Sequence, residues 1–135
     1  MNWIVAGLIA GVVAYLVDYV MWGKVFTKGM DGFATPPPAG QPVNMGPMLA
    51  KSAILALVFG VLLAFLYKHF MHSLWVAAGP LAGMEFASVL WLPTLLANVG
   101  GSVWFDRVRP LHRAATWSWL ARMLAAGLVV GLLIR

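Results

Sequence analysis

Four long apolar stretches dominate this chain, near residues 3–22, 49–67, 74–98 and 115–134. Each offers roughly the 20 apolar residues that a helix needs to cross about 30 Å of hydrocarbon. The apolar–polar alternation of a membrane β-barrel strand is absent, so helices are favoured. The chain is 62% hydrophobic and only 10% charged, whereas globular domains average about 25% charged residues. We therefore expect an all-α membrane protein, a four-transmembrane-helix bundle that occupies residues 1–135 as one domain.

Each apolar stretch carries one ionisable residue, and the sign alternates along the chain: Asp18, Lys51, Glu85 and Arg122. A charge at membrane depth is costly, so it needs a partner, water or a functional role. Asp18 lies about 20° from Gly7 on a helical wheel and is expected to face other helices. We predict two pairs, Asp18 with Lys51 and Glu85 with Arg122.

These charges have three interpretations. The pairs can be structural, because each partner makes the other tolerable and fixes the helix register. Alternatively, Glu85 is the protonatable group of an ion or proton route. In a third arrangement Lys51 and Arg122 extend to the headgroups, which leaves the two acids unpaired.

Glycines recur four residues apart in three of the stretches, a spacing that lets membrane helices approach closely. The glycines at similar depth are Gly7 and Gly11, Gly60, Gly79 and Gly83, and Gly127 and Gly131. All lie toward the end of the bundle that carries the chain termini, so we predict Gly-x-x-x-Gly packing and the tightest contacts there. A dimerisation role for the same glycines is the alternative.

Lysine and arginine are unevenly distributed between the two sides of such a bundle, and this bias predicts orientation. One side collects Lys24, Lys28, Lys51 at its edge, Arg107, Arg109 and Arg113, and the other has only Lys68 and Arg135. We predict a multi-pass protein of a bacterial inner membrane with both termini on the non-cytoplasmic side. The net charge of +5 then matches anionic lipid and does not call for nucleic acid.

Prolines and glycines fill the first connection, from about residue 25 to 47, which cannot continue a helix. It is either an inert connector or, through Pro36, Pro37 and Pro38, a stiff docking surface. The second long connection, residues 100–113, alternates apolar with charged residues and is predicted to lie in the membrane interface. In the third stretch, Pro93 is the candidate for a kink.

Residues that carry enzyme chemistry are scarce. The chain has no cysteine, which removes disulfides, thiolate metal sites and thiol catalysis. His69, His72 and His112 lie at opposite ends of the predicted spans, and no glycine-rich phosphate loop is present. We expect no enzyme activity, no metal and no cofactor.

The opening segment, from Met1-Asn2-Trp3 through Gly7-Leu8-Ile9-Ala10-Gly11 to Asp18-Tyr19 and Trp22-Gly23-Lys24, resembles the start of short bacterial four-span proteins in families of unknown function. The resemblance covers about the first 30 residues. It implies a four-helix inner-membrane protein and assigns no functional residue.

These features predict a non-enzymatic structural or accessory component of a membrane. It would act by self-association or as a subunit of a larger membrane complex, so its expected partners are the lipid bilayer and other membrane subunits or itself. The alternative is a small ion- or proton-coupled transporter that uses the carboxylates of Glu85 and Asp18.

Overall fold

The computed structural model describes residues 2–27, 39–42 and 44–134, and four long helices dominate them. These are α1 (Trp3–Val20), α2 (Gly46–Phe70), α3 (Pro80–Trp104) and α4 (Arg109–Leu133). A π-helical turn, η1 (Met21–Val25), extends α1, and 3-10 turns η3 (Met71–Ser73) and η4 (Asp106–Val108) follow α2 and α3. No strand occurs in this part of the chain. The expected all-helical architecture, with four helices long and apolar enough to span a membrane, is confirmed.

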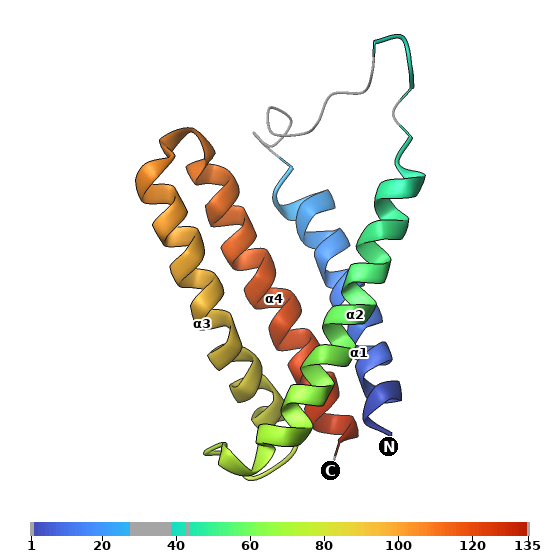
Figure 1. The fold of residues 1–135 in the computed structure, drawn as a ribbon, viewed down its shortest axis with the longest axis vertical. Helices are drawn as coiled ribbons and strands as arrows, with labels where there is room; N and C mark the ends of the chain where they lie inside the picture. Colours follow the sequence, from blue (N-terminus) through green and yellow to red (C-terminus); the bar gives the residue numbers. More distant parts are fainter. Residues whose placement is uncertain (1, 28–38, 43, 135) are drawn as a thin grey trace.

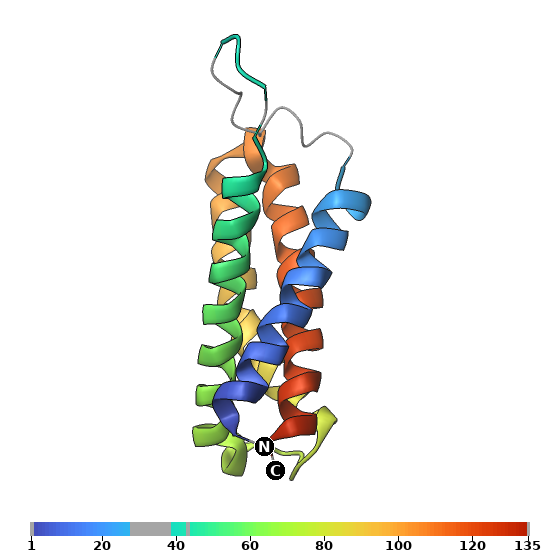
Figure 2. The ribbon, with the colours of Figure 1, turned by 90° about the vertical axis from the view of Figure 1, so that its right-hand side faces the viewer.

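The four helices run antiparallel in sequence order (Figures 1 and 2). Both chain ends and the α2–α3 connection lie at one end of the molecule, which we call the terminal end. The end of η1, the start of α2 and the α3–α4 connection lie at the opposite end, which we call the connection end. Helix α1 packs against both α2 and α4, and α3 packs on α4, whereas α2 and α3 hardly touch. The bundle therefore consists of two hairpins, α1–α2 and α3–α4, which are joined through α1 and α4 and leave an open edge between α2 and α3.

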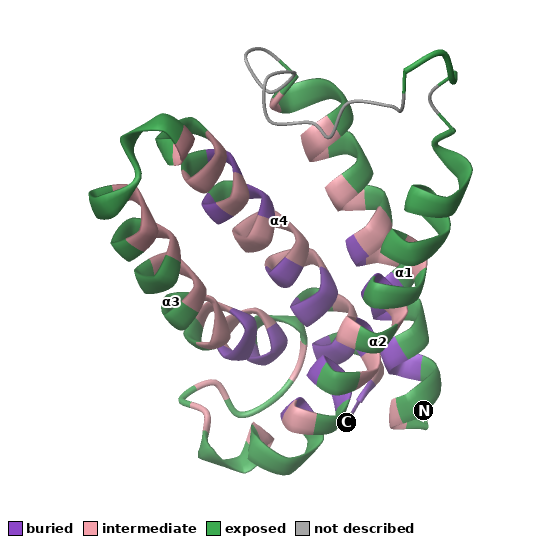
Figure 3. Cartoon of the chain, turned by 45° about the horizontal axis from the view of Figure 1, so that its top comes forward, coloured by how far each residue is buried: buried purple, intermediate pink, exposed green. Residues whose placement is uncertain are grey.

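Small residues make most of the core, because closely approaching helices leave room only for short side chains. Most of the buried residues lie toward the terminal end, and the connection ends of α2 and α3 are largely exposed (Figure 3). The core cluster consists of Ala6, Ala10, Ala14, Leu63, Ala64, Tyr67, Ala82, Phe86, Ala126, Val130 and Ile134.

Glycines occupy the crossing points of both hairpins. A Cβ added at Gly11 would lie 2.6 Å from the carbonyl oxygen of Ala56, and one at Gly7 would lie 2.7 Å from the Cα of Val61. In the second hairpin, a Cβ at Gly83 would lie 2.8 Å from the backbone nitrogen of Gly131. These distances are shorter than van der Waals contact, so only glycine fits at these backbone-to-backbone approaches.

Helix starts differ from the sequence prediction, and proline explains the difference. Helices α2, α3 and α4 each begin with a proline in the first turn, at Pro47, Pro80 and Pro110. Proline suits this position because its ring presets the helical φ and its missing N–H is not needed there. The third helix therefore starts at Pro80 and not near residue 74, after Gly79 with φ +92°. The fourth starts at Arg109 and not near 115.

These starts also change the connections. The connection predicted for residues 100–113 is shorter than expected, because α3 continues to Trp104 and only a short turn precedes α4. Its position in the membrane interface stays a prediction. Pro93 lies inside α3, which runs through it as one helix. The first connection ends where α2 begins at Gly46, and the proposed docking prolines Pro36 to Pro38 lie outside the described residues.

Candidate functional site

A polar cluster joins the two hairpins toward the connection end of the bundle. Arg122 of α4 and Asp18 of α1 form an ion pair, with 3.5 Å between the arginine Nη1 and the carboxylate Oδ2. The hydroxyl of Ser118, one turn before Arg122, donates to the other carboxylate oxygen at 2.9 Å. The Arg122 side chain is 16% exposed and that of Asp18 is 28% exposed. Both oxygens of the acid are thus engaged by α4, and the cluster ties α1 to α4.

The guanidinium of Arg122 also contacts two aromatic rings. Its central carbon lies 3.3 Å from the ring centroid of Trp119 and 5.2 Å from that of Phe59. A cation over an aromatic face is attracted by the ring quadrupole, and more so where water is excluded. The Nε of Arg122 is buried and has no hydrogen-bond partner among the described residues. The charge is therefore stabilised by one carboxylate and two rings and lacks a full set of hydrogen bonds.

Asp18 also lines a cavity of about 320 Å³ between α1 and the start of α2. Three aromatic side chains of α1 and η1 share this lining, namely Tyr15, Tyr19 and Trp22. Gly23, Met45, Leu49 and Ser52 complete it. Among the described residues of the wall, Asp18 is the only aspartate, glutamate, histidine, lysine or arginine.

The predicted pair of Asp18 with Lys51 is wrong. Lys51 is exposed on α2 and forms no ion pair with a described residue. Asp18 shares the side of α1 that carries Gly7 and Gly11, and that side contacts α2 at the two glycines, but nearer the connection end the Asp18 side chain reaches Ser118 and Arg122 of α4. The expectation that Asp18 faces other helices holds, but the partner helix differs.

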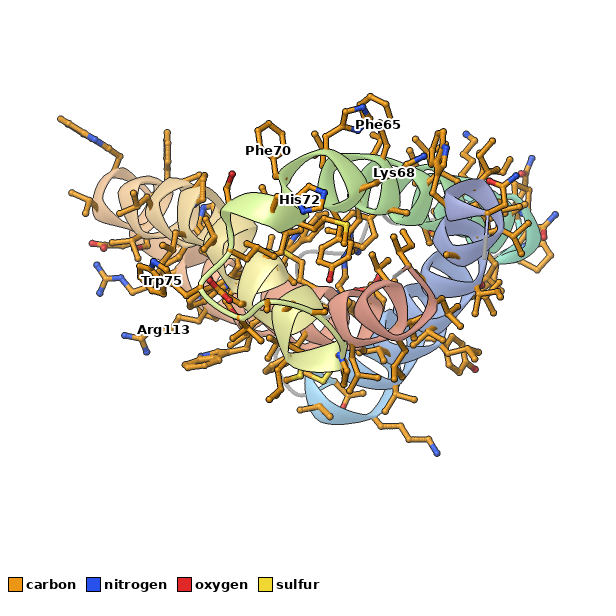
Figure 4. All side chains as sticks on the ribbon, turned by 90° about the horizontal axis from the view of Figure 1, so that it is seen from below. Phe65, Lys68, Phe70, His72, Trp75 and Arg113 are labelled. Atoms are coloured by element: carbon orange, nitrogen blue, oxygen red, sulfur yellow. The ribbon has the colours of Figure 1, made fainter. Side chains whose placement is uncertain are left out.

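The predicted pair of Glu85 with Arg122 is also wrong. The carboxylate of Glu85 accepts hydrogen bonds from the backbone N–H groups of Trp75 and Val76, both at 2.9 Å. Because α3 starts at Pro80, Glu85 lies in its second turn, about 7 Å from the helix start at 1.5 Å per residue. Arg122 lies about 16 Å from the same end of α4. Glu85 thus anchors the α2–α3 connection, from which Trp75 projects, 96% exposed (Figure 4).

Polar contacts that the charge pattern did not predict join α3 to α4. The indole N–H of Trp91 donates to the carbonyl of Thr116 at 3.0 Å. The Nδ1 of His112 lies 3.3 Å from the side-chain oxygen of Asn98. The sequence did not predict these pairings, because they depend on how α3 and α4 are rotated about their own axes.

A larger cavity of about 660 Å³ lies at the connection end, between the end of α1 and the first turns of α4. Its basic lining residues are Lys24, Arg109 and Arg113, and Asp106 pairs with Arg109. The Arg113 side chain projects away from the bundle (Figure 4). This feature is a basic rim of the connection end, in contrast to the smaller cavity at Asp18, whose wall carries a carboxylate.

Within residues 2–27, 39–42 and 44–134, no three histidine, aspartate or glutamate side chains cluster as metal ligands would. No family model, curated protein or solved structure matches the chain. The fold and the site therefore define an all-helical bundle with four potential membrane spans, a buried charge pair and an anchored connection.

Proposed function

We propose that this chain is a non-enzymatic structural component of a bacterial inner membrane that works by self-association. Its four apolar helices cross the bilayer, and the close glycine contacts within each hairpin are the Gly-x-x-x-Gly packing of a membrane bundle. The observation that carries the proposal is that both acids within the helices are used internally. Asp18 binds Arg122 and Ser118, and Glu85 binds two backbone N–H groups.

Internal partners remove the need for a catalytic or transport role for these carboxylates. An acid with partners inside the bundle can fix helix register and connection geometry, whereas an acid in a proton route must exchange its partners. Glu85 in particular ties the start of α3 to the connection before it, which is a local structural task.

The open edge between α2 and α3 is the surface that supports self-association. At the terminal end it forms an apolar groove of about 310 Å³ between the end of α2 and α3. The groove is lined by Leu66, Phe70, Ser73, Leu74, Phe86, Val89 and Leu90. Two-fold symmetry is the commonest symmetry of homo-oligomers. In such a dimer the α2–α3 edge of one copy would pack against the same edge of the other copy.

The distribution of charge supports the predicted orientation. The basic rim of Lys24, Arg109 and Arg113 lies at the connection end, and the chain termini lie at the other end. Cytoplasmic surfaces of membrane proteins are enriched in lysine and arginine, so we place the connection end in the cytoplasm.

Cysteine cross-linking tests self-association, because the chain has no native cysteine. Val89 lies in the groove and is 54% exposed. Val12 of α1 is the matched control, because it is 50% exposed and lies as far from the start of α1 as Val89 lies from the start of α3. We expect Val89→Cys to form a disulfide dimer in native membranes and Val12→Cys to remain monomeric. Two results would refute the proposal. One is that both variants stay monomeric and native mass spectrometry of the protein from mild detergent shows one copy. The other is that both variants cross-link equally.

The second candidate is a small ion- or proton-coupled transporter, which the cavity at Asp18 favours. A carboxylate that is 28% exposed and lines a cavity of about 320 Å³ can be reached from outside the bundle. Proton-coupled flux in proteoliposomes that Asp18→Asn abolishes, with the bundle intact, would replace the structural role by this one.

A further inference from the structure

The geometry points to a binding site for an organic cation, a quaternary or protonated amine, in the cavity between Asp18 and the aromatic side chains of α1. This inference is independent of the proposed self-association. It rests on the composition of the cavity wall, on the arrangement of the Asp18–Arg122 pair and on access to the cavity.

The cavity wall combines the two groups that recognise organic cations. Asp18 contributes a carboxylate, and Tyr15, Tyr19 and Trp22 contribute aromatic rings. These residues recur at helical spacing along one side of α1 and its extension η1, so they share one surface. Aromatic faces attract ammonium groups, and aromatic cages are a recurrent way of binding quaternary ammonium ligands. Among the described residues of the wall there is no lysine or arginine that would repel a cation.

The ion pair leaves Asp18 able to accept a second cation. The distance of 3.5 Å to Arg122 exceeds the roughly 2.7–2.9 Å of a charge-assisted hydrogen bond. A carboxylate also has about four lone-pair positions, of which Ser118 uses one. The guanidinium of Arg122 also lies over the ring of Trp119, and Arg122 is not among the described residues of the cavity wall. Arg122 is thus an internal partner with which an external cation would compete for Asp18.

The cavity is also accessible and has the volume of a small ligand. Tyr19 is 58% exposed and Met45 is 53% exposed at its edge. Small-molecule sites begin at about 300 Å³, and this cavity is about 320 Å³. An ammonium ligand that carries one phenyl ring matches both its aromatic wall and its size.

The site can be tested by isothermal titration calorimetry. Benzyltrimethylammonium is titrated into the full chain in phosphatidylglycerol nanodiscs. We expect saturable binding that Trp22→Leu weakens about tenfold, since a desolvated cation–π contact contributes about that much. Trp104→Leu is the matched control, because Trp104 lies at the same end of the bundle, is 84% exposed and is absent from the cavity wall. An excess of neopentylbenzene, the uncharged carbon analogue, is expected not to displace the ligand.

Charge variants separate a carboxylate site from simple partition into the bilayer. Arg122→Gln is expected to tighten binding, because it removes the internal competitor. The double variant Asp18→Asn/Arg122→Gln leaves no unpaired charge and is expected to lose binding while its circular dichroism spectrum stays unchanged. Equal affinity in the double variant and the parent would overturn the site, as would displacement by neopentylbenzene or an equal effect of Trp22→Leu and Trp104→Leu.

A lipid headgroup and a free amine share this chemistry, and the nanodisc composition distinguishes them. Replacing part of the phosphatidylglycerol with phosphatidylethanolamine adds a lipid ammonium group. Weaker benzyltrimethylammonium binding in those discs assigns the site to a lipid headgroup, and unchanged binding assigns it to a free amine. Absence of saturable binding in phosphatidylglycerol discs overturns both.

Discussion

Gly83 gives the sharpest test of how the second hairpin is packed. Substitution by alanine adds one methyl group where α3 meets α4, and that methyl would lie 2.8 Å from both the carbonyl carbon of Gly127 and the backbone nitrogen of Gly131. These are backbone atoms, so no side-chain rotation can relieve the contact. The two helices must therefore move apart where they cross.

The expected cost follows from a matched variant in the same helix. Gly100 also lies in α3, but a Cβ there meets nothing within 4 Å. Both substitutions change helix propensity by the same amount, about 0.5–1 kcal/mol in favour of alanine, so this contribution cancels in the difference. Overpacking a well-packed contact costs about 1–3 kcal/mol. We therefore expect Gly83→Ala to be less stable than Gly100→Ala by about 2 kcal/mol.

Unfolding in mixed micelles, with sodium dodecyl sulfate as the denaturant and far-ultraviolet circular dichroism as the signal, measures this difference. Gly101→Ala is a useful third variant, because its Cβ would meet the side chain of His112 at 2.9 Å. A side chain can rotate, so this variant should lie between the other two. Equal unfolding free energies for Gly83→Ala and Gly100→Ala would refute the close backbone contact.

Three further outcomes follow from single contacts. Tyr67→Phe should stabilise the bundle by about 1 kcal/mol, because the buried Tyr67 hydroxyl has no hydrogen-bond partner among the described residues and an unpaired buried polar group is costly; a loss of unfolding free energy would contradict this. Glu85→Ala removes two charge-assisted hydrogen bonds, so it should lower the unfolding free energy by about 2 kcal/mol and speed hydrogen exchange of the Trp75 and Val76 amides. Glu85→Gln should have an intermediate effect on both. On intact cells, a membrane-impermeant maleimide should label Ala77→Cys in the α2–α3 connection and not Gln41→Cys in the α1–α2 connection, and the reverse result would invert the predicted orientation.

The number and type of helices could be predicted from the sequence, because a membrane span needs only length and apolarity. Helix boundaries were less predictable for a specific reason. Apolar residues continue without interruption through residues 74–79, so hydropathy alone placed that segment in the third span. Pro80 was the informative signal, since proline favours the first turn of a helix and disfavours its interior.

The charge partners could not be predicted, because they depend on two quantities that a sequence pattern leaves open. One is the axial position of each helix, which moved Glu85 to the start of α3 and away from Arg122. The other is the neighbour relation, since α1 lies between α2 and α4 and Asp18 could face either. Helical phase correctly placed Asp18 on an inward face and could not choose between those two neighbours.

The positions of the glycines and of the charge pair divide the stabilisation of the bundle between its two ends. Toward the terminal end, glycine contacts hold α1 to α2 and α3 to α4. Toward the connection end, where α2 and α3 are widely separated (Figure 1), Asp18, Ser118 and Arg122 join the two hairpins. The apolar core also joins the hairpins toward the terminal end, because α1 and α2 residues such as Ala10 and Tyr67 belong to the same cluster as Phe86 and Val130. The polar cluster adds a second contact between the hairpins, and Asp18 of that cluster also lines the cavity. A ligand that competes with Arg122 for Asp18 would therefore act on a contact between the two hairpins and not within one of them.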